Sequence, residues 1–244
     1  DCLLSRGLGD VYKRQTFMIL GNICTRSCGF CGVKTGRPGN VDWEEPEKVA
    51  QSIKIMKIKH AVITSVDRDD IKDMGSIIWN ETIKAVRRLN PNTTLETLIP
   101  DFQGNKTNID RIIEAAPEVV SHNLETVKRL TREVRVQAKY DQSLEVLQYL
   151  KQMGVNRTKS GIMLGLGEKE EEVYETLHDL RNASVEVVTI GQYLQPSRKH
   201  LPVKSFITPE TFEKYETVAK DLGFRHVESG PLVRSSYKAH KHLH

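Results

Sequence analysis

Three of the four cysteines in this 244-residue chain lie close together, in the run CTRSCGFC. Cys24, Cys28 and Cys31 follow one another at gaps of four and three residues, whereas Cys2 lies far away in the sequence. Three thiolates in one short loop can hold three corners of a cubane iron–sulfur cluster, for which cysteine spacing is the usual indicator. A structural zinc ion normally takes four protein ligands. The motif therefore predicts a [4Fe-4S] cluster that leaves one iron open.

An open iron is useful only if a further ligand binds there, and S-adenosylmethionine (SAM) can do so through its amino and carboxylate groups. The spacing of the three cysteines resembles that of the radical SAM superfamily. The competing interpretation is a partial zinc site that borrows a ligand such as His200 or His226. A measurement of metal content would separate the two interpretations: iron with acid-labile sulfide indicates the cluster, and zinc alone indicates the zinc site.

The elements that must position this motif alternate between short apolar runs and helical repeats. Most of the runs are rich in Val, Ile and Leu, as expected for parallel strands covered on both faces; they lie at 16–22, 60–66, 93–99, 118–122, 160–166 and 185–193. Amphipathic helices are predicted between and after them, at 46–56, 76–89, 108–116, 141–153, 169–182 and 208–222. Six strand–helix units predict a partial parallel (β/α)6 barrel, since eight units usually need about 250 residues. A late strand or extension is expected at 224–227.

Polar runs follow each predicted strand, where active sites of such barrels lie. After the cysteine motif come SVDRDD, IPDFQG, SHNLET, GIMLGLGE and GQYLQP, at 65–70, 99–104, 121–126, 161–168 and 191–196. Each run taken alone could be an ordinary solvated loop. His122 is interpreted as a core histidine, and His240, His242 and His244 as a solvated tail.

Residues 1–15 show no apolar periodicity and no capping pattern, which predicts a disordered or non-native leader. Residues 5–15 resemble the translation of an adapter used to prepare sequencing libraries, so Cys2 is given no functional weight. We expect a single domain over 16–244 and a natural sequence that begins near residue 16, after a missing N-terminal part.

The bulk composition is that of an ordinary globular protein, with 38% hydrophobic and 28% charged residues and a net charge of +4. No block of like charges, long apolar segment or secretory signal is visible. We therefore expect no nucleic-acid or membrane partner. Free thiols for a cluster predict a reducing, cytoplasmic location.

From residue 16 onward the chain resembles the lipoyl synthase family of radical SAM enzymes. The most specific matches are SVDRDD, GQYLQP and RSSY, at 65–70, 191–196 and 234–237. The resemblance implies that Cys24, Cys28 and Cys31 hold the cluster and are the catalytic residues for SAM cleavage. It also implies a cofactor-binding set of Ser65, Asp67, Asn123, Glu125, Gly161, Gly165, Glu168 and Gln192.

The same resemblance implies sulfur insertion at C6 and C8 of an octanoyl group carried on a protein lysine. Expected partners are an electron donor and octanoylated lipoyl-domain proteins, namely acyltransferase subunits of 2-oxoacid dehydrogenases and the glycine cleavage carrier protein. In this family three further cysteines and the first serine of RSSY, here Ser235, hold an auxiliary [4Fe-4S] cluster that is consumed as the sulfur source. The printed sequence lacks those three cysteines. We therefore expect an N-terminally truncated fragment that cleaves SAM but does not complete sulfur insertion.

Two alternatives stay open at this point. Another radical SAM enzyme with a single cluster would explain the missing cysteines but would leave RSSY without a purpose. A zinc-binding module or basic nucleic-acid binder is opposed by the lack of a nearby fourth cysteine and of a basic stripe interleaved with aromatic residues.

Overall fold

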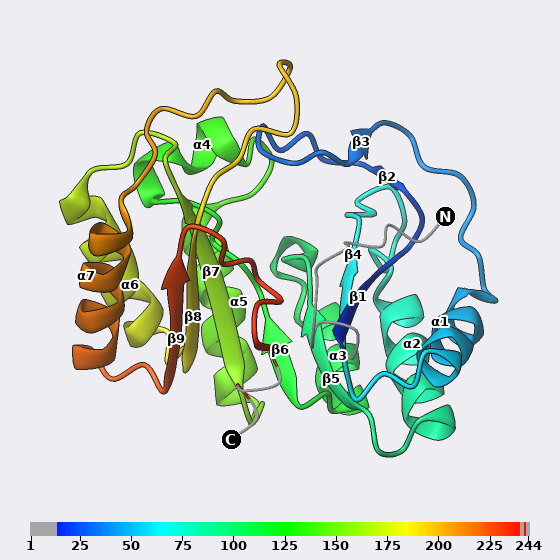
Figure 1. The fold of residues 1–244 in the computed structure, drawn as a ribbon. Helices are drawn as coiled ribbons and strands as arrows, with labels where there is room; N and C mark the ends of the chain where they lie inside the picture. Colours follow the sequence, from blue (N-terminus) through cyan, green and yellow to red (C-terminus); the bar gives the residue numbers. More distant parts are fainter. Residues whose placement is uncertain (1–13, 240–241, 243–244) are drawn as a thin grey trace.

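The chain folds around one curved, parallel, seven-stranded sheet (Figure 1), here in a computed structural model that describes residues 14–239 and 242. The strands pair in the order β1, β4, β5, β6, β7, β8, β9, and β1 and β9 form its two edges. Their bounds are Arg14–Ile19, His60–Ser65, Thr94–Leu98, Val119–Ser121, Thr158–Leu164, Val187–Gln192 and His226–Gly230. Because the described edges do not pair, the sheet is an open, partial barrel, as predicted.

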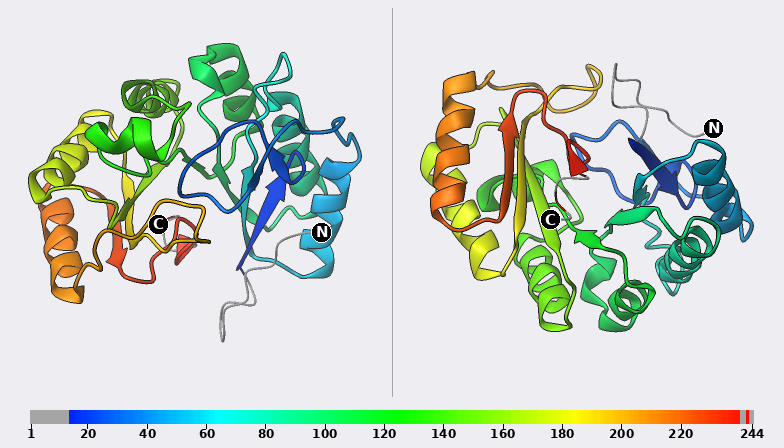
Figure 2. Two further views of the ribbon diagram at one scale, coloured as in Figure 1. Left: turned by 90° about the horizontal axis from the view of Figure 1, so that it is seen from above. Right: turned by 60° about the horizontal axis from the view of Figure 1, so that its bottom comes forward.

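Helices cover the outer side of the sheet (Figure 2) and connect successive strands. The six long helices are α1, α2, α3, α5, α6 and α7, at Glu45–Ile55, Ser76–Leu89, Lys106–Ala115, Tyr140–Gln152, Glu170–Asn182 and Pro209–Asp221. One apolar cluster joins α1, α2 and α3 to the strands β1, β4, β5 and β6, and a second joins α6 and α7 to β7 and β8. The helices and the outer side of the sheet therefore share the apolar core.

Local sequence explains the main boundaries. Asn105 begins α3 by accepting a hydrogen bond from the Asn108 backbone, and Thr208 does the same at α7, where Pro209 follows. Along β1, Phe17 and Ile19 belong to the outer core, while Met18 between them faces the inner cavity. All six predicted strands and helices are confirmed with small shifts of their ends. The late strand joins the sheet as its seventh member.

Several short elements were not predicted, because two to four residues carry no periodicity. They are the two-stranded sheet β2 and β3 (Ile23–Cys24 and Lys34–Thr35), the helix α4 (Thr131–Val134) and the 3-10 turns η2 and η3 (Phe102–Gly104 and Lys128–Leu130). The strand β1 takes its first two residues from the stretch expected to be leader; residues 1–13 lie outside the described part of the chain.

The chain after β9 turns back along the inner side of the sheet (Figure 1). The expectation of a solvated histidine tail is wrong for His242, which is fully buried against Lys159. His240 and His244 lie outside the described residues. Among the described helices none is long and apolar enough to cross a membrane.

Candidate active site

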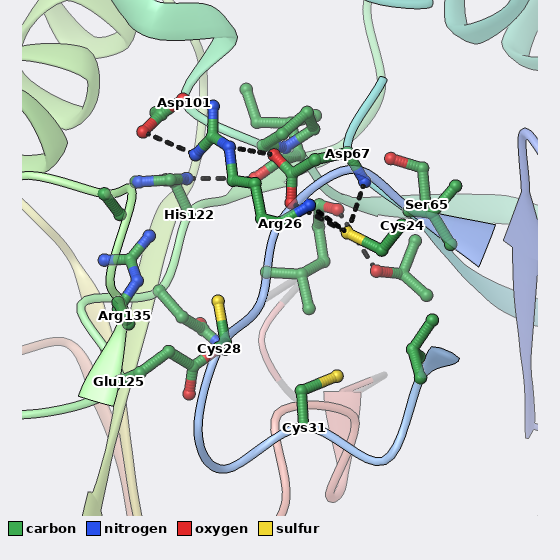
Figure 3. Close-up of a pocket in the computed structure, with 18 of the residues that line it drawn as sticks. Cys24, Arg26, Cys28, Cys31, Ser65, Asp67, Asp101, His122, Glu125 and Arg135 are labelled. Carbon is green, nitrogen blue, oxygen red and sulfur yellow. Dashed lines mark hydrogen bonds and ion pairs between the residues drawn. The ribbon is translucent and has the colours of Figure 1, made fainter. Parts of the chain in front are cut away.

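The three clustered cysteines lie on the loop that follows β1, and their side chains reach one cavity of about 310 Å³ (Figure 3). Cys24 ends β2, whereas Cys28 and Cys31 lie in the loop between β2 and β3. Most of the remaining cavity wall comes from residues at the ends of β4, β5 and β6, and Met18 of β1 and the segment after α4 complete it. The cavity therefore lies at the carboxyl ends of the strands, as predicted from the polar runs that follow them.

A buried arginine inside the motif joins the cysteine loop to the next two strand exits. The guanidinium of Arg26 donates two hydrogen bonds to Asp69, at 2.7 and 2.9 Å, and two to Asp101, at 2.7 and 3.0 Å. Its Nε also lies 3.2 Å from a carboxylate oxygen of Asp67. Arg26 is only 5% exposed, so these charge-assisted contacts are largely shielded from water.

The opposite side of the loop packs on the segments that follow β6 and β8. The backbone N–H of Gly29 donates to Val134, and that of Leu201 donates to Gly29. A Cβ atom at Gly29 would lie 2.9 Å from the Leu201 side chain, so any larger residue would require that side chain to shift. His200 donates from Nε2 to the Cys31 carbonyl oxygen over 2.9 Å. His200 thus positions the loop through its backbone in this structure.

Two backbone N–H groups, those of Arg26 and Asp67, point at the sulfur of Cys24, at 3.4 and 3.3 Å. Such donors favour the thiolate form. Burial nevertheless raises the pKa of all three thiols, that of Cys28 to about 12, while Arg135 counteracts the shift at Cys28. Bound iron would supply the positive charge that stabilises three thiolates here.

The cysteines fit a multi-iron cluster better than a single ion. Within residues 14–239 and 242, no three His, Cys, Asp or Glu side chains lie close enough together to hold one metal ion. The three thiols instead surround a shared cavity. His226, the other candidate zinc ligand, lies in β9 with its ring beside that of His242.

Four of the predicted cofactor-binding residues line this first cavity, namely Ser65, Asp67, Asn123 and Glu125. Ser65 accepts a hydrogen bond from the Trp79 indole at 3.2 Å. Burial raises the pKa of Asp67 to about 6 and also raises that of Glu125. The Asn123 amide donates to Glu125, but its own carbonyl oxygen is buried without a partner in the structure. A buried, unsatisfied acceptor in a cavity wall is a position where a ligand donor would be stabilised.

A second cavity of about 250 Å³ adjoins the first and shares Phe30, Leu98, Asn123 and Glu125 with it. Gly161 and Gln192 line this second cavity, as does Ser235 of the RSSY motif. Six of the eight predicted cofactor-binding residues therefore line one or both of these adjoining cavities.

The remaining two predicted residues lie outside the lining of both cavities. Glu168 accepts hydrogen bonds from the backbone of Gly165 and Leu166, at 2.6 and 2.9 Å, and so closes its own turn. Gly165 has a φ of +99°, and a side chain there would meet Gln192 and the Ser205 carbonyl at 2.3 and 2.4 Å. The cofactor-binding role of this pair stays a prediction.

Several residues of the first cavity were not predicted, chiefly Arg26, Asp101 and Arg135. Arg135 is buried and donates to the Leu124 carbonyl and to Ser143. His122, interpreted as a core residue, is buried between the Ile99 carbonyl and Ser143, and burial lowers its pKa to about 4. The excess of acids in SVDRDD was the one available indication that a cation must lie nearby.

An open parallel barrel with a three-cysteine loop at its carboxyl edge defines the class of radical SAM enzymes. The sequence family described as the Radical SAM superfamily matches residues 18–180. Solved structures with this fold include SuiB of Streptococcus suis bound to S-adenosylmethionine, with a TM-score of 0.70 at 12% identity over 93% of this chain and 52% of that chain. HydG from Carboxydothermus hydrogenoformans has a TM-score of 0.67 at 14% identity over 93% of this chain and 65% of that chain.

Curated relatives are far more similar. The mitochondrial lipoyl synthase of Nematostella vectensis is 81% identical over 94% of this chain and 79% of its own length. The lipoyl synthase of Flavobacterium johnsoniae is 80% identical over 93% of this chain and 79% of its own length. The chain belongs to the lipoyl synthase family, the radical SAM sulfurtransferases that act on octanoylated proteins.

Proposed function

We propose that Cys24, Cys28 and Cys31 of this chain hold a [4Fe-4S] cluster beside a binding site for SAM. The observation that carries the proposal is the convergence of all three thiols on one cavity together with Asp67, Asn123 and Glu125. When bound, cluster and cofactor would supply the radical chemistry that acts on the octanoyl chain, and a one-electron reductant would be needed to start it. An electron donor is therefore an implied partner.

The polar residues of the first cavity are assigned to binding and orienting SAM. Ser65, Asp67, Asn123 and Glu125 surround the space next to the cysteines, and the unpartnered carbonyl oxygen of Asn123 can accept a hydrogen bond from a ligand. The protein's contribution to such chemistry is orientation and the exclusion of competing reactions. Residues that hold a ligand in a fixed place serve that purpose because a reactive centre must be kept near its target.

The second cavity is assigned to the octanoyl group and to the auxiliary cluster of the family. Its walls include the apolar side chains of Phe30, Leu98 and Met163, which suit an alkyl chain. Gly161 and Gln192 contribute to the same wall, and Ser235 would be the auxiliary cluster's oxygen ligand. The carrier partners proposed are lipoyl domains of 2-oxoacid dehydrogenases and the glycine cleavage carrier protein.

Once the three motif cysteines are engaged, Cys2 is the only cysteine left in the printed sequence. An auxiliary cluster needs cysteine thiolates in addition to a serine. We therefore expect this polypeptide to cleave SAM without completing sulfur insertion.

The test is anaerobic reconstitution followed by measurement of iron, zinc, sulfide and deoxyadenosine on one sample. About four irons per chain are expected, the content of one cubane cluster, with deoxyadenosine formation and no lipoyl product. Cys28→Ala should lose both cluster and cleavage, whereas the matched control Cys2→Ala should keep both. A cluster of normal occupancy in Cys28→Ala, or zinc in place of iron, would refute the assignment. About eight irons per chain would refute the single-cluster expectation.

A further inference from the structure

A fully buried ion pair lies on the inner face of the sheet, away from the cysteines. Lys159 of β7 and Glu96 of β5 are both 0% exposed, and the lysine Nζ lies 2.8 Å from Glu96 Oε1. Ser121 of β6, the strand between them, donates to the same carboxylate oxygen at 3.0 Å. Removing two charges from water is costly, so a pair of this kind needs further contacts in compensation.

The further contacts come from the segment that follows β9. A lysine ammonium has three donors, and besides Glu96 the Nζ of Lys159 reaches the carbonyl oxygen of Ser235 and the Nδ1 of His242, the latter at 3.3 Å. The lysine therefore joins the sheet interior to the chain end. Without Lys159 the part-buried Ser235 carbonyl would lose this partner.

Two more contacts hold the same stretch against β8. A side chain at Gly191 would lie 2.2 Å from the Val233 carbonyl oxygen, so the glycine allows the segment to approach the strand closely. The Arg234 guanidinium donates to the Gln192 carbonyl at 3.3 Å. Residues 233–235, which contribute to the wall of the second cavity, are thus held from β8 on one side and from Lys159 on the other.

We infer that Lys159 and Glu96 are positioning residues that fix the segment 231–239, and through it Ser235, inside the barrel. The anchoring is argued from the contacts of Lys159, Gly191 and Arg234. Its relevance to the auxiliary cluster rests on the proposed function, in which Ser235 is a ligand of that cluster. Neither residue lines the first cavity, so anchoring and SAM cleavage are separable.

The first test is hydrogen exchange of the full chain. The double variant Lys159→Met/Glu96→Gln removes both charges, so that no uncompensated charge is left buried. The amides of Tyr237 and Ala239 donate to carbonyls within the segment, and that of Val233 donates to Gly230 at the end of β9. We expect these three amides to exchange at least about tenfold faster, while amides of β7 and β8 keep their rates. The matched control is Lys214→Met/Glu170→Gln, which removes a 2.7 Å pair between α7 and α6 on the outside.

Unchanged exchange in the segment would overturn the inference. So would an equal increase throughout the sheet, or failure of the double variant to fold, because the pair would then support the whole barrel and not this segment. A second measurement tests how accessible residue 235 is. In a Ser235→Cys background, alkylation of residue 235, quantified by mass spectrometry, should be about tenfold faster when Lys159 and Glu96 are replaced.

Deoxyadenosine formation by the reconstituted double variant should stay within about twofold of the parent, since the first cavity is untouched. Loss of cleavage with an unchanged segment would show that the pair acts on the first cavity, which overturns the inference. If the parent chain itself does not cleave SAM, the proposed function fails, and the exchange and alkylation results still decide the anchoring.

Discussion

Arg26 and Asp101 are 75 residues apart in the sequence, yet their side chains form a two-point pair with hydrogen bonds of 2.7 and 3.0 Å. Arg26 lies between the first two cysteines of the motif, and Asp101 lies at the exit of β5. The pair therefore sets the height of the cysteine loop over the strand ends. Planar, bidentate geometry of this kind gives a fixed orientation that a lysine could not reproduce.

Replacing Arg26 by Met should lower both stability and cluster content. The change leaves the buried carboxylate of Asp101 without its main partner, which costs about 3–5 kcal/mol for a buried pair. Urea unfolding and iron content after reconstitution are the measurements. Arg26→Lys should recover only part of the loss. The control Arg88→Met removes a surface pair with Glu47 and should cost less than about 1 kcal/mol. Normal stability and iron content in Arg26→Met would contradict the role of this arginine.

Asp101 should make the unfolding free energy depend on pH in the acid range. Burial alone would raise the pKa of its carboxyl, but the hydrogen bonds and charge of Arg26 outweigh burial and lower the pKa to about 2. In the unfolded chain the pKa of an aspartate carboxyl is about 3.9. Because the folded pKa is the lower one, the stabilisation is complete above about pH 4 and is lost as the pH falls toward about 2.

The comparison that isolates this effect is between the parent chain and Asp101→Asn, unfolded by urea at a series of pH values. The variant should be less stable by about 2 kcal/mol near neutral pH, and the difference should shrink below about pH 4. Parallel stability curves down to acid pH would show that Asp101 does not contribute in this way.

Gly191→Ala should push the C-terminal segment away from β8. The added carbon would lie 2.2 Å from the Val233 carbonyl oxygen, a backbone atom that cannot move by a simple side-chain rotation. We expect a loss of about 1–3 kcal/mol in unfolding free energy, the usual cost of overpacking. Gly39→Ala, where no atom lies within 4 Å, is the matched control and should be neutral. An alanine at 191 with parental stability would mean that the segment is not held closely against β8.

Loading the cluster should raise the melting temperature, since metal bound only by the folded chain stabilises that state. Burial raises the pKa of the free Cys28 and Cys31 thiols, so the unloaded protein holds protonated sulfur in the loop between β2 and β3, and ligation to iron would replace those protons. Melting with and without the cluster, by anaerobic calorimetry, is the measurement. Cys28→Ala treated in the same way should show no increase. Equal melting temperatures for loaded and unloaded parent chain would argue against three-thiolate ligation.

The strand–helix alternation was predictable because it depends on local sequence. Buried parallel strands such as His60–Ser65 read as continuous apolar runs, and the helix Ser76–Leu89 repeats its apolar residues with the helical period. The cysteine motif was equally visible, since all of its residues fall within one loop. The short helix α4 left no comparable pattern, although Val134 at its end supports Gly29 of the cysteine loop.

Local sequence patterns predict the class of fold, the three-cysteine motif and the strand ends at which polar residues gather. The assembled fold set which of those residues meet. It paired Arg26 with Asp101, joined Lys159 of β7 to Glu96 of β5 and to the chain end, and buried His242 where a solvated tail was expected. The physical reason is that periodicity reports which face of an element is covered, whereas the partner of a buried charge depends on strands that become neighbours only when the sheet curves and assembles.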